Sequence, residues 1–244
     1  MTEPRRTESR KTVAMLAPMV PELAPLKRKI PLQRTDEGNG AYSHVGHVGD
    51  VLVVAAITGI GTQPAKETTE RLLDGIAVDH VMVVGIAGGM GLSVAIGDLV
   101  IPELVIDEAT GKQVRPNVLG SATPRGTIVT SDRFGYDDET NARFIADGVV
   151  SVDMETSAVG LVCEARGVPW SAYRGISDRG DDDTVDVEVL KLAGADGSGN
   201  GRALAKYLLR RPWKILYLAK LGMGTMKAVN VAADAAIAAC ADVR

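Results

Sequence analysis

The sequence predicts an α/β fold: a single domain with a twisted, mixed and largely parallel sheet flanked by helices. Short β-rich runs alternate with helical patterns, as in a parallel sheet that carries helices on its faces. The run His80–Gly85 is almost continuously apolar, which is typical of a strand buried on both faces. The chain has 244 residues, enough for one large domain, and it shows no internal repeat.

The expected elements follow one another along the chain. Thr12–Ala17 is the first strand, and Pro21–Lys29 is a helix with a proline near its start. Ala41–Val48 and Val51–Ile57 form a hairpin across Gly49-Asp50. The other expected strands are His80–Gly85, Asp98–Ile106, Thr127–Thr130, Val149–Val152 and Trp170–Ile176, and the other expected helices are Lys66–Ile76, Asn141–Asp147, Glu155–Arg166 and the final region Ala203–Ala241.

The two ends of the chain differ from the domain between them. Residues 1–10 are polar and basic with no apolar stretch after them, so we expect a disordered tail and not a secretory signal. The domain is expected over residues 11–244, with an extended helical segment at about 202–241. Thr110–Pro124 is rich in turn residues, and Ala193–Gly201 is a glycine-rich break.

Composition argues against several classes of function. The net charge is −4 and aromatic residues make up 4%, so the chain is not expected to bind nucleic acid. No stretch approaches the roughly 20 apolar residues of a membrane span. Cys163 and Cys240 have no metal-ligand spacing, and Cys163 is expected in the core. We therefore expect a cytoplasmic protein.

Polar residues and glycine loops follow the ends of the expected strands. In open parallel sheets, ligands bind beyond the carboxyl ends of the strands, so such positions share one edge if the strands are parallel. Arg174 lies in the last expected strand, close to Asp178. Two acids and a cation at one edge suit a polar small molecule whose leaving group must be protonated. The positions after strands are Glu22, Gly59-Ile60-Gly61, Gly85-Ile86-Ala87-Gly88-Gly89, Phe134, Glu155 and Asp178.

Each of these features has a simpler interpretation when it is taken alone. The glycine loops could be tight turns between a strand and a helix, and they lack the spacing of a dinucleotide fingerprint. Glu22 and Glu155 could be acids that stabilise helix starts. Asp178 could be a turn cap, and Phe134 could be a core residue. Only their joint placement favours a site.

Four motifs occur in an order that resembles the nucleoside phosphorylase and nucleosidase superfamily, and in particular the 5′-methylthioadenosine/S-adenosylhomocysteine nucleosidases. They are GIAGGMGLSVAIGDLVI, IVTSDRF, VDMETSAVGLVCEARGVPW and YRGISD. The resemblance runs from about Lys11 to Asp183. It implies a mixed sheet flanked by helices, a homo-oligomer without cofactor or metal, and cleavage of the N-glycosidic bond of a purine nucleoside.

The resemblance also implies roles for individual residues. Asp178 matches the acid that serves the purine N7, which promotes departure of a poor leaving group. Glu155 matches the acid that holds the ribose hydroxyls, where its charge also favours an oxocarbenium-like transition state. Glu22 matches the acid that deprotonates the attacking water, and Arg174 matches a residue bonded into that water site. The implied substrate contacts also include Met154 against the sugar, Phe134 stacked on the base, Met19 and Ile60 beside the 5′-substituent, and Ala87 and Gly88 in the glycine loop.

The nucleophile is expected to be water and not phosphate. The strand His80–Gly85 lacks the arginine usual in phosphorylases, and Ile86 stands where the family has a hydroxyl residue. Glu22 would repel phosphate. Two alternatives stay open: a phosphorylase that takes phosphate contacts from a neighbouring subunit, and a non-catalytic nucleoside-binding protein. Ile86 favours the second of these, whereas the set of acids and arginine argues against it.

Several segments depart from the family pattern. Val105–Thr123 is shorter and lacks an aromatic residue and a histidine, and Gly135 stands where an apolar side chain is usual. Leu204–Met226 is an addition that is either core packing or a lid over a bulky 5′-substituent, and lipid-linked adenosyl compounds are included in that range. This addition carries Trp213, Leu216, Tyr217 and Met223.

The histidines and the acidic run are not expected to act in catalysis. His44 and His47 lie on the expected hairpin and are assigned to the surface, and His80 is assigned a structural role at the start of a buried strand. Asp178–Asp183 resembles a cation cluster but is interpreted as a solvated loop.

Overall fold

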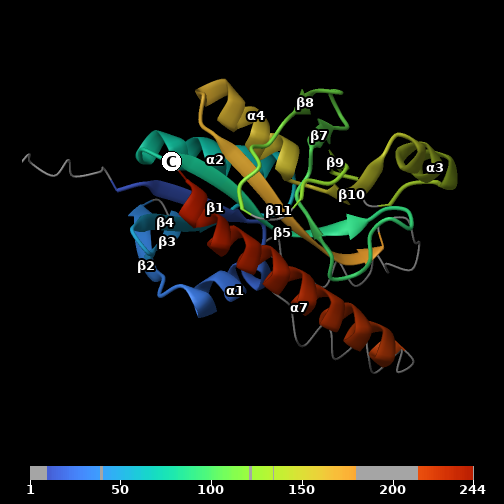
Figure 1. Cartoon of the computed structure of the whole chain (residues 1–244), viewed down its shortest axis with the longest axis horizontal. Coiled ribbons are helices and arrows are strands. Elements are labelled where there is room, and N and C mark those ends of the chain that lie inside the picture. Colours follow the sequence, from blue (N-terminus) through green and yellow to red (C-terminus); the bar gives the residue numbers. More distant parts are fainter. Residues whose placement is uncertain (1–9, 39–40, 121–122, 134, 180–213, 244) are drawn as a thin grey trace, which may run out of the picture.

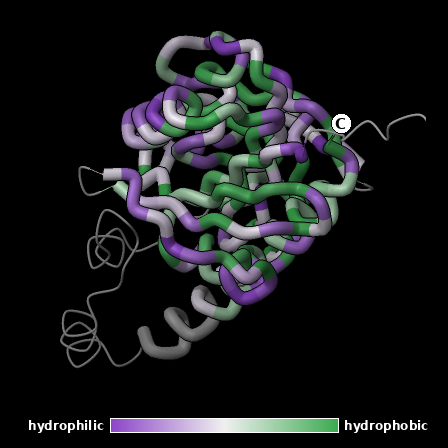
Figure 2. Tube along the Cα trace, turned by 90° about the vertical axis from the view of Figure 1, so that its left-hand side faces the viewer, coloured by the Kyte–Doolittle hydropathy of each residue, from purple (hydrophilic) through white to green (hydrophobic). Residues whose placement is uncertain are grey.

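The structure is a computed structural model that describes residues 10–38, 41–120, 123–133, 135–179 and 214–243, with the backbone alone at 214–221. Its centre is one mixed sheet of eleven strands, with helices on both faces (Figure 1). The apolar segments run through the interior strands (Figure 2). The strands are β1 Thr12–Ala17, β2 Gln33–Gly38, β3 Ala41–Val48, β4 Val51–Ile57, β5 His80–Gly89, β6 Leu99–Val100, β7 Leu104–Asp107, β8 Gln113–Val114, β9 Thr127–Thr130, β10 Val149–Asp153 and β11 Trp170–Arg179.

The helices cover the sheet in two layers. α1 and α7 lie on one face, and α2 and α4 lie on the other (Figure 1). Their bounds are α1 Val20–Lys29, α2 Thr62–Gly75, α3 Asp138–Ala146, α4 Thr156–Arg166 and α7 Lys214–Ala239, which continues into a 3₁₀ turn at Cys240–Asp242.

Strand β5 lies at the centre of the sheet and pairs with three other strands, β1, β10 and β11. Along one edge it pairs with β11 in parallel, from Val81 to Gly89. Along the other edge, its first half pairs with β1 in parallel and its last two residues pair with β10 in antiparallel fashion. Two branches of the sheet therefore leave this second edge of β5: β1, β4, β3 and β2 follow its first half, and β10, β9, β7 and β8 follow its end.

Side chains of β11 alternate between the two faces and tie both helix layers to the sheet. Trp170 and Ile176 belong to the apolar cluster that includes α4, and Tyr173 belongs to the cluster that includes α7. A Cβ atom at Gly175 would collide with the carbonyl group of Ala228, so α7 can lie this close to β11 only because residue 175 is glycine.

Most expected strands and the hairpin are confirmed, and the differences have physical reasons. Gly85–Gly89 was expected as a loop, but it continues β5 because it pairs with β11 throughout and its last two residues also pair with β10. Asp98–Ile106 was expected as one strand and is two, interrupted at Pro102, which lacks an amide proton for the ladder. β2 was not expected, because all six of its residues are exposed and its sequence QRTDEG carries no apolar pattern.

Other expectations meet mixed outcomes. Cys163 is buried as expected, and His47 is exposed, but His44 is 4% exposed and its surface assignment is wrong. His80 is buried and its ring lies 3.0 Å from the Ser171 hydroxyl, as a structural role requires.

Several expectations fall partly or wholly outside the described residues. Residues 1–9 and 203–213 are among these, whereas residues 214–239 are helical as expected. Met223 is 66% exposed, so it is not a core residue in this chain. Over the described ranges, no helix has the length and hydropathy that crossing a membrane requires. The same ranges hold no cluster of metal-ligating side chains, and Asp178 and Arg179 are the only residues of the acidic run that they include.

Candidate active site

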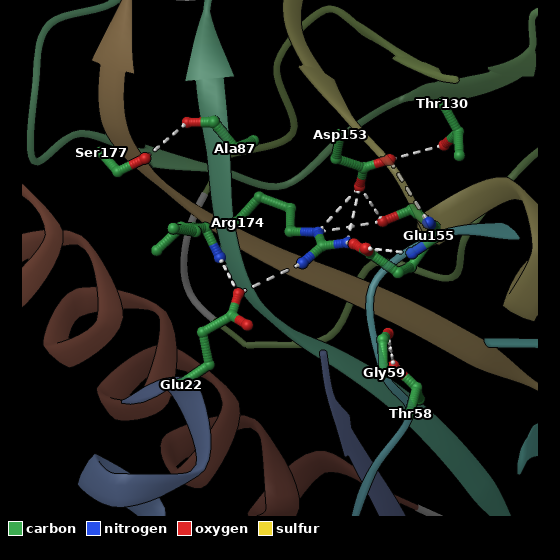
Figure 3. Close-up of polar contacts among 12 residues, drawn as sticks. Glu22, Thr58, Gly59, Ala87, Thr130, Asp153, Glu155, Arg174 and Ser177 are labelled. Carbon is green, nitrogen blue, oxygen red and sulfur yellow. Dashed lines mark hydrogen bonds and ion pairs between the residues drawn. The ribbon is translucent and has the colours of Figure 1, made fainter. Parts of the chain in front are cut away.

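A fully buried arginine stands at the centre of three carboxylates (Figure 3). Nη2 of Arg174 lies 2.8 Å from Oδ2 of Asp153 and 3.0 Å from Oε2 of Glu155. On the opposite side, its Nη1 lies 3.8 Å from Oε1 of Glu22. All three acids are less than 9% exposed, so the attractions act in a medium of low dielectric constant. We call these four residues the Arg174 cluster.

The Arg174 cluster forms where two strands end opposite each other. β1 and β10 share one edge of β5 but run in opposite directions, with Leu16 beside Val83 and Val152 beside Gly88. Their carboxyl ends therefore meet near Gly85, which in turn pairs with Arg174 of β11. β10 does not meet the condition of parallel strands on which the shared edge was predicted, because it runs antiparallel to β5. The residues still converge because β5 extends beyond Gly85 and gives β10 a place to pair.

Two glycine-rich segments, the end of β5 and the loop after β4, place carboxylates through their backbone amides. The N–H of Ile86 donates to Oε1 of Glu22 over 2.7 Å, and the N–H of Gly61 donates to Oε1 of Glu155 over 3.0 Å. A Cβ atom at Gly85 would collide with the Glu22 carboxylate and lie 2.6 Å from Nη1 of Arg174. Glycine at position 85 is thus needed for the two side chains to approach each other.

Burial dominates the electrostatics of the cluster. It raises the pKa of Glu22 to about 8, against the opposing charge of Arg174 and with a further rise from Glu155. Burial also raises the pKa of Glu155. For Arg174 burial opposes the charge, but Asp153, Glu155 and Glu22 together outweigh it and raise its pKa. The arginine is therefore always charged, whereas Glu22 can hold a proton at neutral pH.

The cluster contains two buried polar atoms that make no hydrogen bond. Oε2 of Glu22 and Nη1 of Arg174 have no hydrogen-bond partner among the described residues. Buried polar groups are almost always bonded, so this pair is suited to a polar reactant that both donates and accepts.

Asp153 is a cluster residue that sequence reasoning missed. Its Oδ1 accepts from the hydroxyl of Thr130 over 2.6 Å, and its Oδ2 accepts from Nε of Arg174 over 2.9 Å and from the hydroxyl of Thr156. The sequence signal that could have identified Asp153 is its position as the last residue of a buried strand, three residues before Thr156, whose amide and hydroxyl donate to its carboxylate. The sequence suggested only an acidic helix start there.

Asp178 lies on the same strand as Arg174 but outside the cluster. It pairs with Gly88 of β5, and its Oδ1 accepts from the hydroxyl of Ser177. Ser177 also donates to the carbonyl of Ala87 over 3.5 Å, beyond the cluster in Figure 3. Burial raises the pKa of Asp178, and the Ser177 hydroxyl offsets part of the rise.

The remaining expected contact residues lie on several different segments. Met19 precedes α1, Ile60 stands between the two positive-φ glycines 59 and 61, and Met154 separates the two acids that follow β10; all three are half-buried. Ala87 and Gly88 are strand residues between the Arg174 cluster and Asp178. Phe134 lies outside the described residues.

Fold and site together define an α/β protein whose mixed sheet carries a buried, acid-rich cluster around one arginine. The chain belongs to the phosphorylase superfamily, whose family model matches residues 12–121 and 117–210.

Among curated proteins, the chain is similar to nucleosidases. It is 32% identical to the 5′-methylthioadenosine/S-adenosylhomocysteine nucleosidase of Actinobacillus succinogenes, over 56% of this chain and 72% of that protein. It is 26% identical to the protein of the same name from Chromohalobacter salexigens, over 68% of this chain and 83% of the other.

Solved structures share the fold. One is the 5′-methylthioadenosine/S-adenosylhomocysteine nucleosidase of Neisseria meningitidis in complex with methylthio-immucillin-A, with a TM-score of 0.73, 20% identity and coverage of 95% of this chain and 99% of that one. Another is the futalosine hydrolase of Helicobacter pylori, with a TM-score of 0.71, 16% identity and coverage of 96% and 98%.

Proposed function

We propose that the chain hydrolyses the N-glycosidic bond of a purine nucleoside, with adenine as the base and water as the nucleophile. The observation that carries this proposal is the pair of unbonded, buried atoms Oε2 of Glu22 and Nη1 of Arg174. The names of the curated relatives point to the same reaction.

Glu22 is suited to act as the base that activates water. A water molecule between the two unbonded atoms would donate to Oε2 of Glu22 and accept from Nη1 of Arg174. As the water oxygen attacks the anomeric carbon, its proton passes to Glu22. A base with a pKa near the working pH accepts a proton efficiently and releases it again, and the pKa of about 8 for Glu22 meets this condition.

Asp178 is suited to protonate the leaving base. Its raised pKa keeps the carboxyl group protonated to a higher pH than usual, and Ser177 bonds to Oδ1, which leaves Oδ2 for the purine N7. The three residue steps from Gly85 to Gly88 of β5 span about 10 Å. That separation between base and acid is comparable with the length of a nucleoside.

Glu155 is suited to hold the sugar. Gly61 bonds to one of its oxygens and Arg174 to the other, so the carboxylate is fixed while each oxygen keeps acceptor capacity for a ribose hydroxyl. Its negative charge, close to the sugar, would also stabilise the positive charge that develops at the anomeric carbon.

Water is favoured over phosphate because the described site has little positive charge to spare. Its arginine already faces three carboxylates, and the N–H of Ile86, which could have bound a phosphate oxygen, bonds to Glu22. A phosphate dianion beside Glu22 would add repulsion in a buried setting.

The deciding experiment measures base release from methylthioadenosine, S-adenosylhomocysteine, adenosine and inosine, each with and without phosphate. Release without phosphate, together with free sugar as product, is expected. Release that requires phosphate and yields a sugar phosphate would show a phosphorylase and overturn the role given to Glu22.

Two further expectations complete the proposal. The chain is proposed to form a homo-oligomer, which sedimentation velocity tests directly, and to act in the cytoplasm without a metal or cofactor. Full activity after dialysis against a chelator is the expected result for the metal, and loss that zinc or magnesium restores would contradict it.

A further inference from the structure

A cavity lies on the side of α1 that faces away from Glu22. Its volume is about 360 Å³, and it is bounded by α1, the β2–β3 hairpin and the end of β4. This volume is within the range of about 300–1,000 Å³ that small-molecule pockets occupy. We call it the α1 cavity.

Helix geometry separates the α1 cavity from the proposed catalytic site. Val20, Leu23, Ala24 and Lys27 line it and recur at the spacing of one helical face. Glu22 is about 200° around the helix from Val20, because each residue advances the helix by about 100°, and it is buried against Gly85 on the opposite side.

All charged residues that line the cavity are cations. They are Lys27 and Arg28 of α1 and Arg34 of β2. Arg28 donates to the side chain of Asn230 over 3.3 Å, but neither Lys27 nor Arg34 has an acidic partner among the described residues. The guanidinium of Arg34 lies 3.9 Å from the centre of the Tyr42 ring, which also lines the cavity and holds this cation in place.

A buried imidazole in the cavity wall has an unused polar atom. His44 is 4% exposed, and its Nδ1 has no hydrogen-bond partner among the described residues. The ring of Tyr42 meets its ring edge-on, with centroids 5.6 Å apart. Leaving a buried polar atom unbonded costs about 1–3 kcal/mol, so a ligand group that bonds to it gains affinity.

We propose that the α1 cavity binds a small organic anion with an apolar body, such as an aromatic carboxylate. The carboxylate is held by Lys27, Arg34 and His44, and the body packs on the apolar wall that Leu23 and Leu32 contribute. This site is independent of the proposed hydrolysis and stands if that reaction is disproved.

Occupancy should be visible at His44. Burial lowers the pKa of His44, and the charges of Lys27 on α1 and Arg34 on β2 lower it further. Tyr42 of its own strand is a further titratable group that contacts the ring. A bound carboxylate opposes the two cations, so the pKa of His44 rises on binding.

The experiment titrates the full chain with 1-naphthoate and follows the ring Cε1–H signal of His44 by NMR as a function of pH. The expected result is saturable binding that raises the pKa of His44, whereas the neutral analogue 1-naphthamide leaves it unchanged. Saturation that does not move the His44 signal, or no binding at millimolar naphthoate, would overturn the proposal.

Matched variants show whether the cations that line the α1 cavity bind naphthoate. Lys27→Met and Arg34→Met are each expected to weaken binding at least tenfold, whereas Lys112→Met removes an exposed lysine outside the cavity and should change it less than twofold. Equal binding by all three variants would place naphthoate elsewhere. A changed sedimentation coefficient for Lys27→Met or Arg34→Met would instead assign this face to contact between copies of the chain, which also overturns the proposal.

Discussion

The two ends of the reactive stretch of β11 differ in how firmly their acids are held. At Arg174, a charged and fully buried side chain is bound by three carboxylates. At Asp178, a partly buried carboxyl group accepts a single hydrogen bond from the described residues, donated by its neighbour Ser177. The comparison teaches that the proposed nucleophile end is rigid and preorganised, whereas the leaving-group end has capacity for bonds that only the substrate base supplies.

The largest effect is expected from Glu22→Gln at the rigid end. The amide keeps the size of the side chain but cannot accept the proton of water, so kcat should fall by about 10³-fold or more while nucleoside binding persists. Stopped and continuous assays of adenine release measure the rate, and calorimetry measures binding. Unchanged turnover in this variant would disprove the proposed function.

Asp178→Asn tests the leaving-group end of the proposed site. With adenosine substrates, we expect kcat to fall by about 10²–10⁴-fold, because an amide cannot protonate N7. A p-nitrophenyl riboside carries a leaving group that departs without protonation, so its cleavage should fall less than about tenfold. Equal losses with both substrates would mean that Asp178 does not act on the leaving group.

Gly85→Ala tests how tightly the rigid end is packed. Because the added methyl group would collide with the Glu22 carboxylate and lie beside Arg174, we expect activity to fall by about 10²-fold. Gly75→Ala is the matched control, since a methyl group there meets nothing within 4 Å and should leave activity unchanged. Comparable activities for the two variants would contradict the close approach at Gly85.

Asp153→Asn tests the carboxylate that bonds to Arg174 without a proposed proton-transfer role. Loss of one charged partner should lower unfolding free energy by about 1–3 kcal/mol and reduce kcat about tenfold, because Arg174 is held less firmly. Denaturant unfolding and the split between kcat and KM are the measurements. A rise in KM alone would indicate a substrate contact and not a positioning role.

The pH dependence should report the raised pKa of Glu22. In the free protein at pH 7, roughly one molecule in ten carries the charged form of Glu22, so kcat/KM should rise towards a pH of about 8. Asp178 must stay protonated, so activity falls again when that group ionises. A profile that is flat between pH 6 and 8 would contradict the assigned base.

The same pKa makes a prediction for stability. Glu22 is protonated in both states below its ordinary value of 4.5, and only the folded state retains the proton up to about 8. Stability from this group is therefore fully present below pH 4.5 and is lost as the pH rises to about 8, by at most about 5 kcal/mol. Glu22→Gln should flatten this part of the curve, as urea unfolding at pH 5 and 8 would show.

Local sequence signals predicted much of the fold and part of the site. Glu22 and Glu155 were identifiable because each follows a strand that ends in a buried setting. The direction of β10 could not be predicted from the sequence, because strand direction depends on the pairing partners and not on local residues. Asp153 was missed because an acid before a helix has an ordinary explanation.

The error at His44 has the same kind of cause. The polar strand β2 has no apolar pattern, yet it pairs with β3 and places Arg34 beside His44. Burial there comes from a neighbour that the pattern did not reveal. Similarly, Gly85–Gly89 has the composition of a turn and becomes a strand only because two other strands pair with it.

Because residue 175 is glycine, β11 is covered by a helix that is synthesised later. This glycine admits α7, the last helix, against the strand that carries Arg174 and Asp178. During synthesis, β11 leaves the ribosome well before its cover does, since α7 begins at Lys214. In a nascent chain, this face of β11 therefore stays uncovered until α7 has been synthesised.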